Sequence, residues 1–307
     1  MFTADAHCDT LYEIAVMQKE EFKVTPERLA AGNVGIQVFA MFAGHEQEGR
    51  DFARAQRMLA ALRALPLPFL SGALPDAPPE TPHAVLSIEG GDVLEGSLEK
   101  LAGLDDIARI RMIALTWNFE NEIGYPASGG SDKGLKPFGF ELLREMDRRG
   151  ILADVSHLNE AGFRDVVERA KLPPVASHSN CRWLCDVPRN LKKEQARALI
   201  ERGGFIGINF YSNFLAKDRP AALDDVVRHI DELMELGGGR AVGFGSDFDG
   251  MDTWPDGLGS PADFPNFLEL LEKRGYTQAQ IADIAGLNLW RVLKIAESMR
   301  RLPPTAV

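Results

Sequence analysis

The sequence contains few cysteines, and their small number excludes a fold built on disulfide bonds. Cys8, Cys181 and Cys185 are the three cysteines among 307 residues, too few for a disulfide framework at this length. The last two form a C-x3-C pair that could in principle bind a metal, but no second cysteine pair accompanies it. We therefore expect free thiols in a reducing compartment and a cytoplasmic location.

Long apolar runs and concentrated positive charge are also lacking. No apolar stretch reaches the roughly 18 residues that a membrane span needs, so no membrane partner is expected. No positively charged segment with an apolar run precedes His7, and we expect no signal peptide. No long basic run is present and the net charge is −11, so nucleic acid is not an expected partner. The acidic excess favours solubility.

What the sequence does contain is an alternation of short apolar segments with amphipathic ones. The apolar segments are rich in β-branched residues, which predicts strands, and most of the segments between them predict helices. The predicted strands are 3–9, 35–42, 83–89, 111–117, 151–157, 175–179, 205–210 and 242–247. The predicted helices lie near 48–65, 140–149, 159–171, 192–201, 222–236, 277–285 and 289–300.

This alternation predicts an α/β fold with a parallel sheet, because each strand is connected to the next through a right-handed helical crossover. Eight such units in 307 residues favour a (β/α)8 TIM-type barrel. We expect one domain over residues 1–307, with additional helices at its C-terminal end. The alternative is a doubly wound open sheet, but no G-x-G-x-x-G motif opens a helix to support it.

Polar side chains recur at the carboxyl ends of the predicted strands. The set is His7, Asp9, Glu89, His157, His178 and Asp247. In a barrel these strand ends converge on one mouth, where the active sites of this fold lie. Each residue alone has a structural explanation, such as a hydrogen-bonded histidine, a helix-capping glutamate or an aspartate in a turn. Their coincidence at several strand ends instead indicates one site.

The residue types in this set suit a metal centre. Imidazole nitrogens and carboxylate oxygens bind zinc and similar divalent ions. Five ligands exceed what one tetrahedral zinc takes, so we expect two ions that share Glu89, whose two oxygens can each bind one. Such a pair lowers the pKa of a water to give a hydroxide nucleophile. Asp247 is expected to take the water's proton and pass it to the leaving amine.

The motifs around these residues resemble those of the membrane dipeptidase family (renal dipeptidase-like, metallopeptidase family M19). They are DAHCDT, SIEGGD, LTWN, DVSH, SHSN, VPRN, NFY and GSDFDG, in family order, followed by GLNLWRV near the end. The resemblance implies an amidohydrolase-like barrel with a binuclear zinc site. It implies that His7 and Asp9 bind one zinc, that His157 and His178 bind the other, and that Glu89 bridges them.

The resemblance also implies substrate contacts. Arg189 matches the arginine that holds the C-terminal carboxylate of the substrate, a role that suits a bidentate guanidinium. Tyr211 matches a tyrosine of the pocket, and Asn190, beside Arg189, is grouped with these residues as substrate-binding. Trp117 stands where mammalian members have a histidine that contacts the substrate carbonyl, as in the bacterial branch. An indole N–H donates but cannot accept a proton, which leaves the stabilisation of the oxyanion open.

We therefore predict a zinc-dependent dipeptidase that hydrolyses dipeptides with a metal-bound hydroxide, including L-Xaa-D-Xaa as well as L,L substrates. Binding of the free carboxylate by Arg189 is expected to exclude longer peptides. One alternative is another amidohydrolase-type reaction on N-acyl amino acids, lactams or lactones. Another is a non-catalytic binding barrel, which the complete ligand set argues against. Family analogy also suggests a homodimer.

Overall fold

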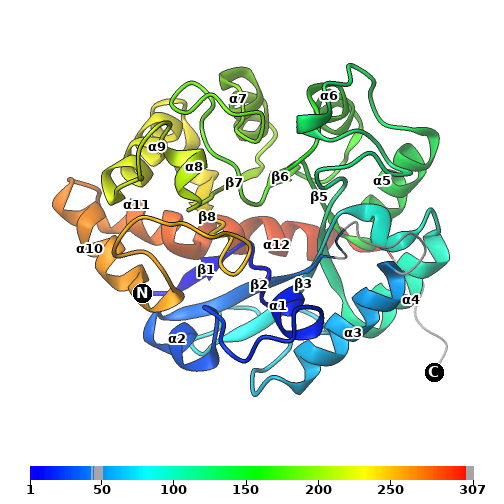
Figure 1. Cartoon of the computed structure of the whole chain (residues 1–307), viewed down its shortest axis with the longest axis horizontal. Coiled ribbons are helices and arrows are strands. Elements are labelled where there is room, and N and C mark those ends of the chain that lie inside the picture. Colours follow the sequence, from blue (N-terminus) through cyan, green and yellow to red (C-terminus); the bar gives the residue numbers. More distant parts are fainter. Residues whose placement is uncertain (43, 45–50, 302–307) are drawn as a thin grey trace.

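The computed structural model describes residues 1–42, 44 and 51–301. At its centre, eight parallel strands form a closed barrel in sequential order (Figure 1). The strands are Thr3–Asp5 (β1), Val34–Phe42 (β2), His83–Glu89 (β3), Ile110–Ala114 (β4), Leu152–Asp154 (β5), Val175–Ala176 (β6), Phe205–Ile208 (β7) and Val242–Phe244 (β8). The predicted barrel is confirmed. The pairing of β1 with β8 rules out the open doubly wound sheet.

Several strands end earlier than predicted. Strands β1, β5 and β8 end at Asp5, Asp154 and Phe244, before the polar residues that the prediction placed within them. His157 and Asp247 have positive φ angles of 67° and 64°, a left-handed conformation that does not continue a strand. Most of the candidate site residues therefore lie on the loops that follow the strands, and these loops form the mouth of the barrel.

Helices surround the barrel and cover its outer face (Figure 1). They are Thr10–Ala15 (α1), Pro26–Ala31 (α2), Asp51–Ala64 (α3), Leu98–Ala108 (α4), Pro137–Arg149 (α5), Glu160–Arg169 (α6), Lys193–Glu201 (α7), Ser212–Leu215 (α8), Leu223–Glu235 (α9), Phe264–Lys273 (α10), Gln278–Ala282 (α11) and Asn288–Met299 (α12). A π-helical turn at Asp283–Leu287 joins the last two, and short 3₁₀ turns cover 91–94, 127–129, 238–240 and 261–263.

The predicted helices are present, and the structure adds helices that the prediction does not contain, among them α1, α2, α4 and α8. The first residues of the helix predicted near 48–65 lie outside the described residues, and α3 covers the rest of it. Helix α4 is missing from the prediction, although Ser97 caps it by accepting a hydrogen bond from the backbone N–H of Lys100. A serine at this position is a recognised start signal. Among the described helices, none is long and apolar enough to cross a membrane.

One end of the barrel is closed by apolar packing. Ala4, Val38 and Met112 from the strands form one buried cluster with Trp290 and Leu293 of α12. Helix α12 passes behind the strands in Figure 1. This end is the amino-terminal floor of the barrel, and the polar loops meet at the opposite mouth. The cysteines are buried free thiols, as predicted.

Candidate metal centre

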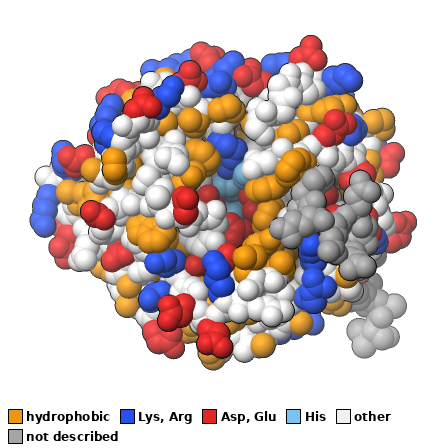
Figure 2. All heavy atoms as spheres, in the orientation of Figure 1, with side chains coloured by type: hydrophobic (Ala, Val, Ile, Leu, Met, Phe, Trp, Pro, Cys, Tyr) orange, Lys and Arg blue, Asp and Glu red, His pale blue; other side chains and the backbone are white. Residues whose placement is uncertain are grey.

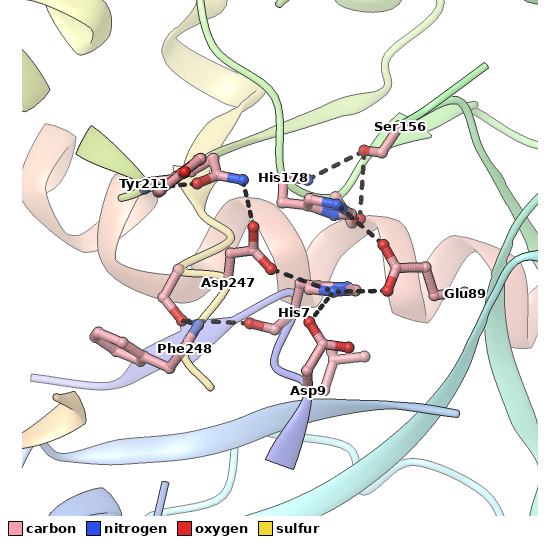
Figure 3. Close-up of polar contacts among 12 residues, drawn as sticks. His7, Asp9, Glu89, Ser156, His178, Tyr211, Asp247 and Phe248 are labelled. Atoms are coloured by element: carbon pink, nitrogen blue, oxygen red, sulfur yellow. Dashed lines mark hydrogen bonds and ion pairs between the residues drawn. The ribbon is translucent and has the colours of Figure 1, made fainter. Parts of the chain in front are cut away.

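Four polar side chains from three strand ends meet at the mouth (Figure 3). His7 and Asp9 follow β1, Glu89 ends β3, and Asp247 follows β8. The Nε2 atom of His7 lies 3.5 Å from Asp9 Oδ2, 3.5 Å from Glu89 Oε2 and 3.7 Å from Asp247 Oδ1. His7 and Asp9 thus reach the same centre although both lie beyond the end of β1.

Glu89 connects this group to two further histidines. Its other oxygen, Oε1, lies 3.0 Å from His157 Nε2 and 3.4 Å from His178 Nε2. The two Nε2 atoms are 3.1 Å apart. Glu89 thus presents one oxygen to His7 and the other to the histidine pair, which is the arrangement of a bridging carboxylate.

The donor set fits a divalent metal. His7, Asp9, Glu89, His157 and His178 are buried, yet His7 Nε2 and Asp9 Oδ1 have no hydrogen-bond partner. Buried polar atoms are normally paired. The ligand atoms of His7, Glu89 and His178 lie within 4.8 Å of one another, and so do those of His7, Asp9 and Asp247. A cation within each group would supply the missing partner.

Hydrogen bonds behind the centre orient two of its side chains. His157 Nδ1 lies 3.0 Å from Asn118 Oδ1. An amide oxygen only accepts, so Nδ1 carries the proton and Nε2 turns its lone pair toward Glu89. Asp247 Oδ2 accepts from Asn209 Nδ2 at 2.8 Å, which leaves Oδ1 facing His7. Asn118 and Asn209 are not among the predicted site residues, although both lie in family-like motifs, LTWN and NFY.

The charges of the centre shift its pKa values in opposite directions. Burial raises the pKa of Asp9, and the charge of Glu89 adds to this. Burial also acts to raise the pKa of Glu89, but the facing histidines hold it well below its ordinary value. Burial lowers the pKa of His157 to about 4 and, together with His7, lowers that of His178. An ionised Glu89 and neutral His157 and His178 are the states that metal ligation requires.

His7 differs from the other two histidines. Burial acts to lower its pKa, but Glu89 and Asp9 raise it well above the ordinary value. The carboxylates on this side of the centre therefore attract positive charge strongly enough to outweigh burial of the ring. A divalent ion bound between them would replace the proton of His7.

A glycine allows the β8 loop to approach both carboxylates. A Cβ atom on Gly250 would lie 2.0 Å from Asp9 Oδ2 and 2.7 Å from Asp247 Oδ1. These distances are far below van der Waals contact. The last residue of the GSDFDG motif therefore has to be glycine if both carboxylates are to keep their places.

A pocket of about 290 Å³ opens over the centre, and three predicted substrate contacts, Trp117, Arg189 and Tyr211, line it. Figure 2 shows the hollow, with histidine at its bottom. Arg189 is partly buried, its guanidinium lies 5.5 Å from the centre of the Phe214 ring, and one Nη atom donates to the carbonyl of His178 at 3.3 Å. Its Nε has no partner. Arg189 thus keeps donors free beside the metal centre.

Aromatic rings form one wall of this pocket. The rings of Tyr12 and Phe42 are 5.1 Å apart, and those of Phe42 and Trp117 are 4.7 Å apart.

Asn190 does not line this pocket, because its Nδ2 donates to the carbonyls of Cys185 and Phe214 at 2.8 and 2.9 Å. It borders a separate cavity of about 40 Å³. Its contacts hold the loop that carries Arg189.

Comparison with known proteins identifies the family. The model of the membrane dipeptidase family, peptidase family M19, matches residues 1–306. The chain belongs to this family. An uncharacterized Klebsiella pneumoniae protein is 37% identical over 220 residues, covering 68% of this chain and 80% of that protein. An uncharacterized dipeptidase of Schizosaccharomyces pombe is 34% identical over 220 residues, covering 69% of this chain and 52% of the yeast protein, about half its length.

Solved structures of M19 and related proteins have the same fold. A metallopeptidase from Rhodobacter sphaeroides, liganded with a phosphinate mimic of L-Ala-D-Ala, is 24% identical with a TM-score of 0.84, covering 96% of this chain and 99% of that one. The probable dipeptidase PvdM of Pseudomonas aeruginosa is 18% identical with a TM-score of 0.86, covering 97% and 96%. At these identities the likeness shows the fold alone.

Membership of the M19 family confirms the resemblance drawn from the motifs, and with it the predicted metallo-dipeptidase class and its dependence on metal. The identity and number of the ions and the roles of single residues stay predictions, as do the homodimer, the cytoplasmic location and the single-domain organisation.

Proposed function

We propose that this M19 member hydrolyses the peptide bond of dipeptides with two zinc ions. His7 and Asp9 would hold one ion, His157 and His178 the other, and Glu89 both. The observation that carries the proposal is that the two carboxylate oxygens of Glu89 face different ligand groups. Oε2 lies 3.5 Å from His7 Nε2, and Oε1 lies 3.0 Å from His157 Nε2. When bound, zinc supplies a water of lowered pKa and polarises the scissile carbonyl.

Asp247 is the proposed proton carrier. Its Oδ2 is held by Asn209, and its Oδ1 faces His7 at 3.7 Å, so one oxygen is fixed while the other points into the centre. A carboxylate held in this way can take a proton from the attacking water and deliver it to the leaving amine. Asn209 would act by holding Asp247 in place.

Arg189 is proposed to bind the C-terminal carboxylate of the substrate. Its guanidinium borders the same pocket as Glu89 and has donor capacity left, and a bidentate pair with a carboxylate would fix the distance from that end to the metals. A longer peptide would have no carboxylate at this position. The aromatic wall of Tyr12, Phe42 and Trp117 would pack against an apolar part of the substrate.

The proposed substrates include L,D as well as L,L dipeptides. Its support is the Rhodobacter sphaeroides relative, which was solved with a mimic of L-Ala-D-Ala. Hydrolysis of N-acyl amino acids, lactams or lactones is the competing reaction class, because the same metal centre could perform it.

One purified sample tests the proposal through its metal content and its hydrolysis of L-Ala paired with L- and D-amino acids. We expect two zinc ions per chain, activity that chelation abolishes, and no cleavage of tripeptides. An Arg189→Ala variant should lose dipeptide activity mainly through a higher KM. The matched control is Arg182→Ala, which removes a partly exposed arginine that pairs with Asp186. Zinc-loaded protein that cleaves acylated amino acids but no dipeptide would overturn the substrate assignment.

A further inference from the structure

His178 is held on the side facing away from the metal centre by a chain of two polar side chains. Its Nδ1 lies 2.7 Å from Ser177 Oγ, and Ser177 Oγ in turn forms a short hydrogen bond with Asp154 Oδ2. The other oxygen of Asp154 accepts the backbone N–H groups of Ser156 and Ser177 at 2.9 and 3.0 Å. Asp154, Ser177 and His178 are all buried, so water does not compete for these contacts.

The direction of each hydrogen bond in this chain follows from the acceptor at its end. An ionised carboxylate has no proton to donate, so the single hydroxyl proton of Ser177 goes to Asp154. The oxygen of Ser177 can then only accept from His178, which places the imidazole proton on Nδ1. The lone pair of His178 therefore lies on Nε2, the atom that faces Glu89 Oε1 at 3.4 Å.

A second aspartate and serine pair repeats this arrangement beside β8 without touching a histidine ring. Asp5 Oδ1 accepts the backbone N–H of Ser246 at 2.8 Å, and Asp5 Oδ2 accepts its hydroxyl at 2.5 Å. In both pairs the serine directly precedes a candidate site residue, His178 or Asp247. Ser246 Oγ lies 3.2 Å from the backbone carbonyl of His7, and Asp5 Oδ2 also accepts from Gln37 Nε2 at 3.0 Å, so this pair reaches backbone and an amide side chain but no imidazole.

We propose that Asp154 and Ser177 are positioning residues that hold the proton of His178 on Nδ1 and aim its Nε2 lone pair at the metal. The inference rests on the proposed metal centre. Asp5 and Ser246 form the same kind of hydrogen bonds beside β8. Because they do not contact an imidazole ring, they should not affect the position of the His178 proton. Metal-ligating histidines are commonly fixed through the second ring nitrogen, and loss of such a contact typically weakens metal binding about 10- to 100-fold.

Asp154→Asn is the sharpest test because it can reverse the direction of the hydrogen bonds from Asp154 through Ser177 to His178. The amide oxygen can keep the two backbone N–H groups, and the amide NH₂ then faces Ser177 as a donor. Ser177 would direct its own proton to His178 Nδ1, which moves the imidazole proton to Nε2 and blocks the lone pair. Ser177→Ala removes the chain instead, and Ser177→Thr keeps a hydroxyl. Asp5→Asn and Ser246→Ala are the matched controls.

Two measurements read the result on full-length protein. Nitrogen-15 spectra of the histidine rings in metal-free protein report which nitrogen carries the proton, and His178→Gln assigns the signal. Competition with a chelator measures zinc affinity. We expect Asp154→Asn to move the His178 proton to Nε2 and to weaken zinc binding at least about 10-fold. Ser177→Ala should weaken zinc binding similarly, and Ser177→Thr should restore it.

The controls separate positioning from general loss of structure. Asp5→Asn and Ser246→Ala should lower the unfolding temperature yet leave the His178 proton on Nδ1 and change zinc affinity by less than about threefold. Unchanged proton position in Asp154→Asn and Ser177→Ala would overturn the inference, and so would equal weakening of zinc binding in the controls. Wild-type protein that binds no zinc would overturn the metal centre itself, while the spectra would still decide the role of Ser177.

Discussion

The two ends of the barrel both bury charged side chains, but they pair them differently. At the mouth, His7 Nε2 and Asp9 Oδ1 lack hydrogen-bond partners. At the floor, Asp105 accepts from Nη1 of Arg149 at 2.9 Å and of Arg300 at 2.8 Å, and its other oxygen accepts a backbone N–H at 3.1 Å. The floor carboxylate is thus saturated with donors, whereas the mouth carboxylates converge on one another.

The difference separates a structural cluster from a functional one. Arg111 at the floor is fully buried and reaches Glu297 of α12 and the carbonyls of Leu70 and Gly72, which ties the last helix to the barrel. Breaking such a buried pair is costly because it leaves an uncompensated charge. Carboxylates held close together are also costly, and such groups are typical of sites that a ligand completes. Substitutions at the two ends should therefore affect different properties.

The largest expected effect is the loss of catalysis in Glu89→Gln. The amide keeps the shape of the side chain but removes the charge that faces both ligand groups, so we expect kcat/KM to fall about 10³-fold or more and metal content to drop. The metal-free variant should also unfold at a lower temperature than wild type, because glutamine removes the charge that faces His7 and that the histidines stabilise. Calorimetry, metal analysis and dipeptide kinetics measure these three properties. A fall in stability with metal content and kcat/KM near wild type would place Glu89 with the structural cluster.

At the floor, Asp105→Asn should mainly lower the stability of the protein. It removes the charge that faces Arg109, Arg149 and Arg300, and we expect a loss of about 3 kcal/mol in the free energy of unfolding. Activity at low temperature should stay near wild type. The matched control is Asp106→Asn, whose carboxylate also pairs with Arg149 at 3.2 Å but is 55% exposed, so its loss should be below about 1 kcal/mol. Urea unfolding distinguishes the two, and equal losses would contradict the comparison.

Gly250→Ala tests whether the mouth depends on close backbone approach. The added Cβ would meet Asp9 Oδ2 at 2.0 Å and Asp247 Oδ1 at 2.7 Å, so one or both carboxylates must move. A displacement of about 1 Å can reduce the rate about 100-fold, and we expect a loss of that order with weaker metal binding. Gly103→Ala in α4 is the control, since its Cβ would meet nothing within 4 Å. Wild-type kinetics in Gly250→Ala would show that the carboxylates tolerate displacement.

The sequence predicts which side chains meet at the mouth better than it predicts the contacts that support them. A barrel brings all carboxyl strand ends together, so the pattern of polar residues is enough to predict that His157 and His178 meet. Their supports, Asn118 and Ser177, depend on hydrogen-bond geometry between neighbouring strands, which residue spacing does not encode. Arg189 is identified only through family resemblance, because its burial beside the pocket depends on how the loop after β6 folds.

The positions of the strand ends are predicted less well, for a local reason. His157 and Asp247 continue apolar segments in the sequence, which extends the predicted strands through them. In the structure the strands already end at Asp154 and Phe244. His157 and Asp247 follow in loops with positive φ angles, and their side chains face the mouth. Hydrophobic pattern alone does not contain that backbone change.

The smallest expected effect concerns His229 in α9, a histidine whose two nitrogens are both used. Nδ1 accepts from the backbone N–H of Cys181 at 3.0 Å, and Nε2 lies 3.1 Å from the carbonyl of Leu215. Burial lowers its pKa from 6.5 to about 4. The unfolded chain therefore takes up the proton first, and the stability from neutral His229 is complete above pH 6.5 and decreases toward pH 4. Between pH 6.5 and 5 this loss is about 2 kcal/mol.

Comparison with His229→Gln isolates this contribution, because the groups at the mouth titrate alike in both metal-free proteins. The variant should be less stable at pH 7.5, and its free energy of unfolding should change less between pH 6.5 and 5 than that of wild type. Urea unfolding at several pH values measures both curves. Parallel curves would mean that burial does not keep His229 neutral. The contrast with His7, whose pKa the facing carboxylates raise, would then be lost.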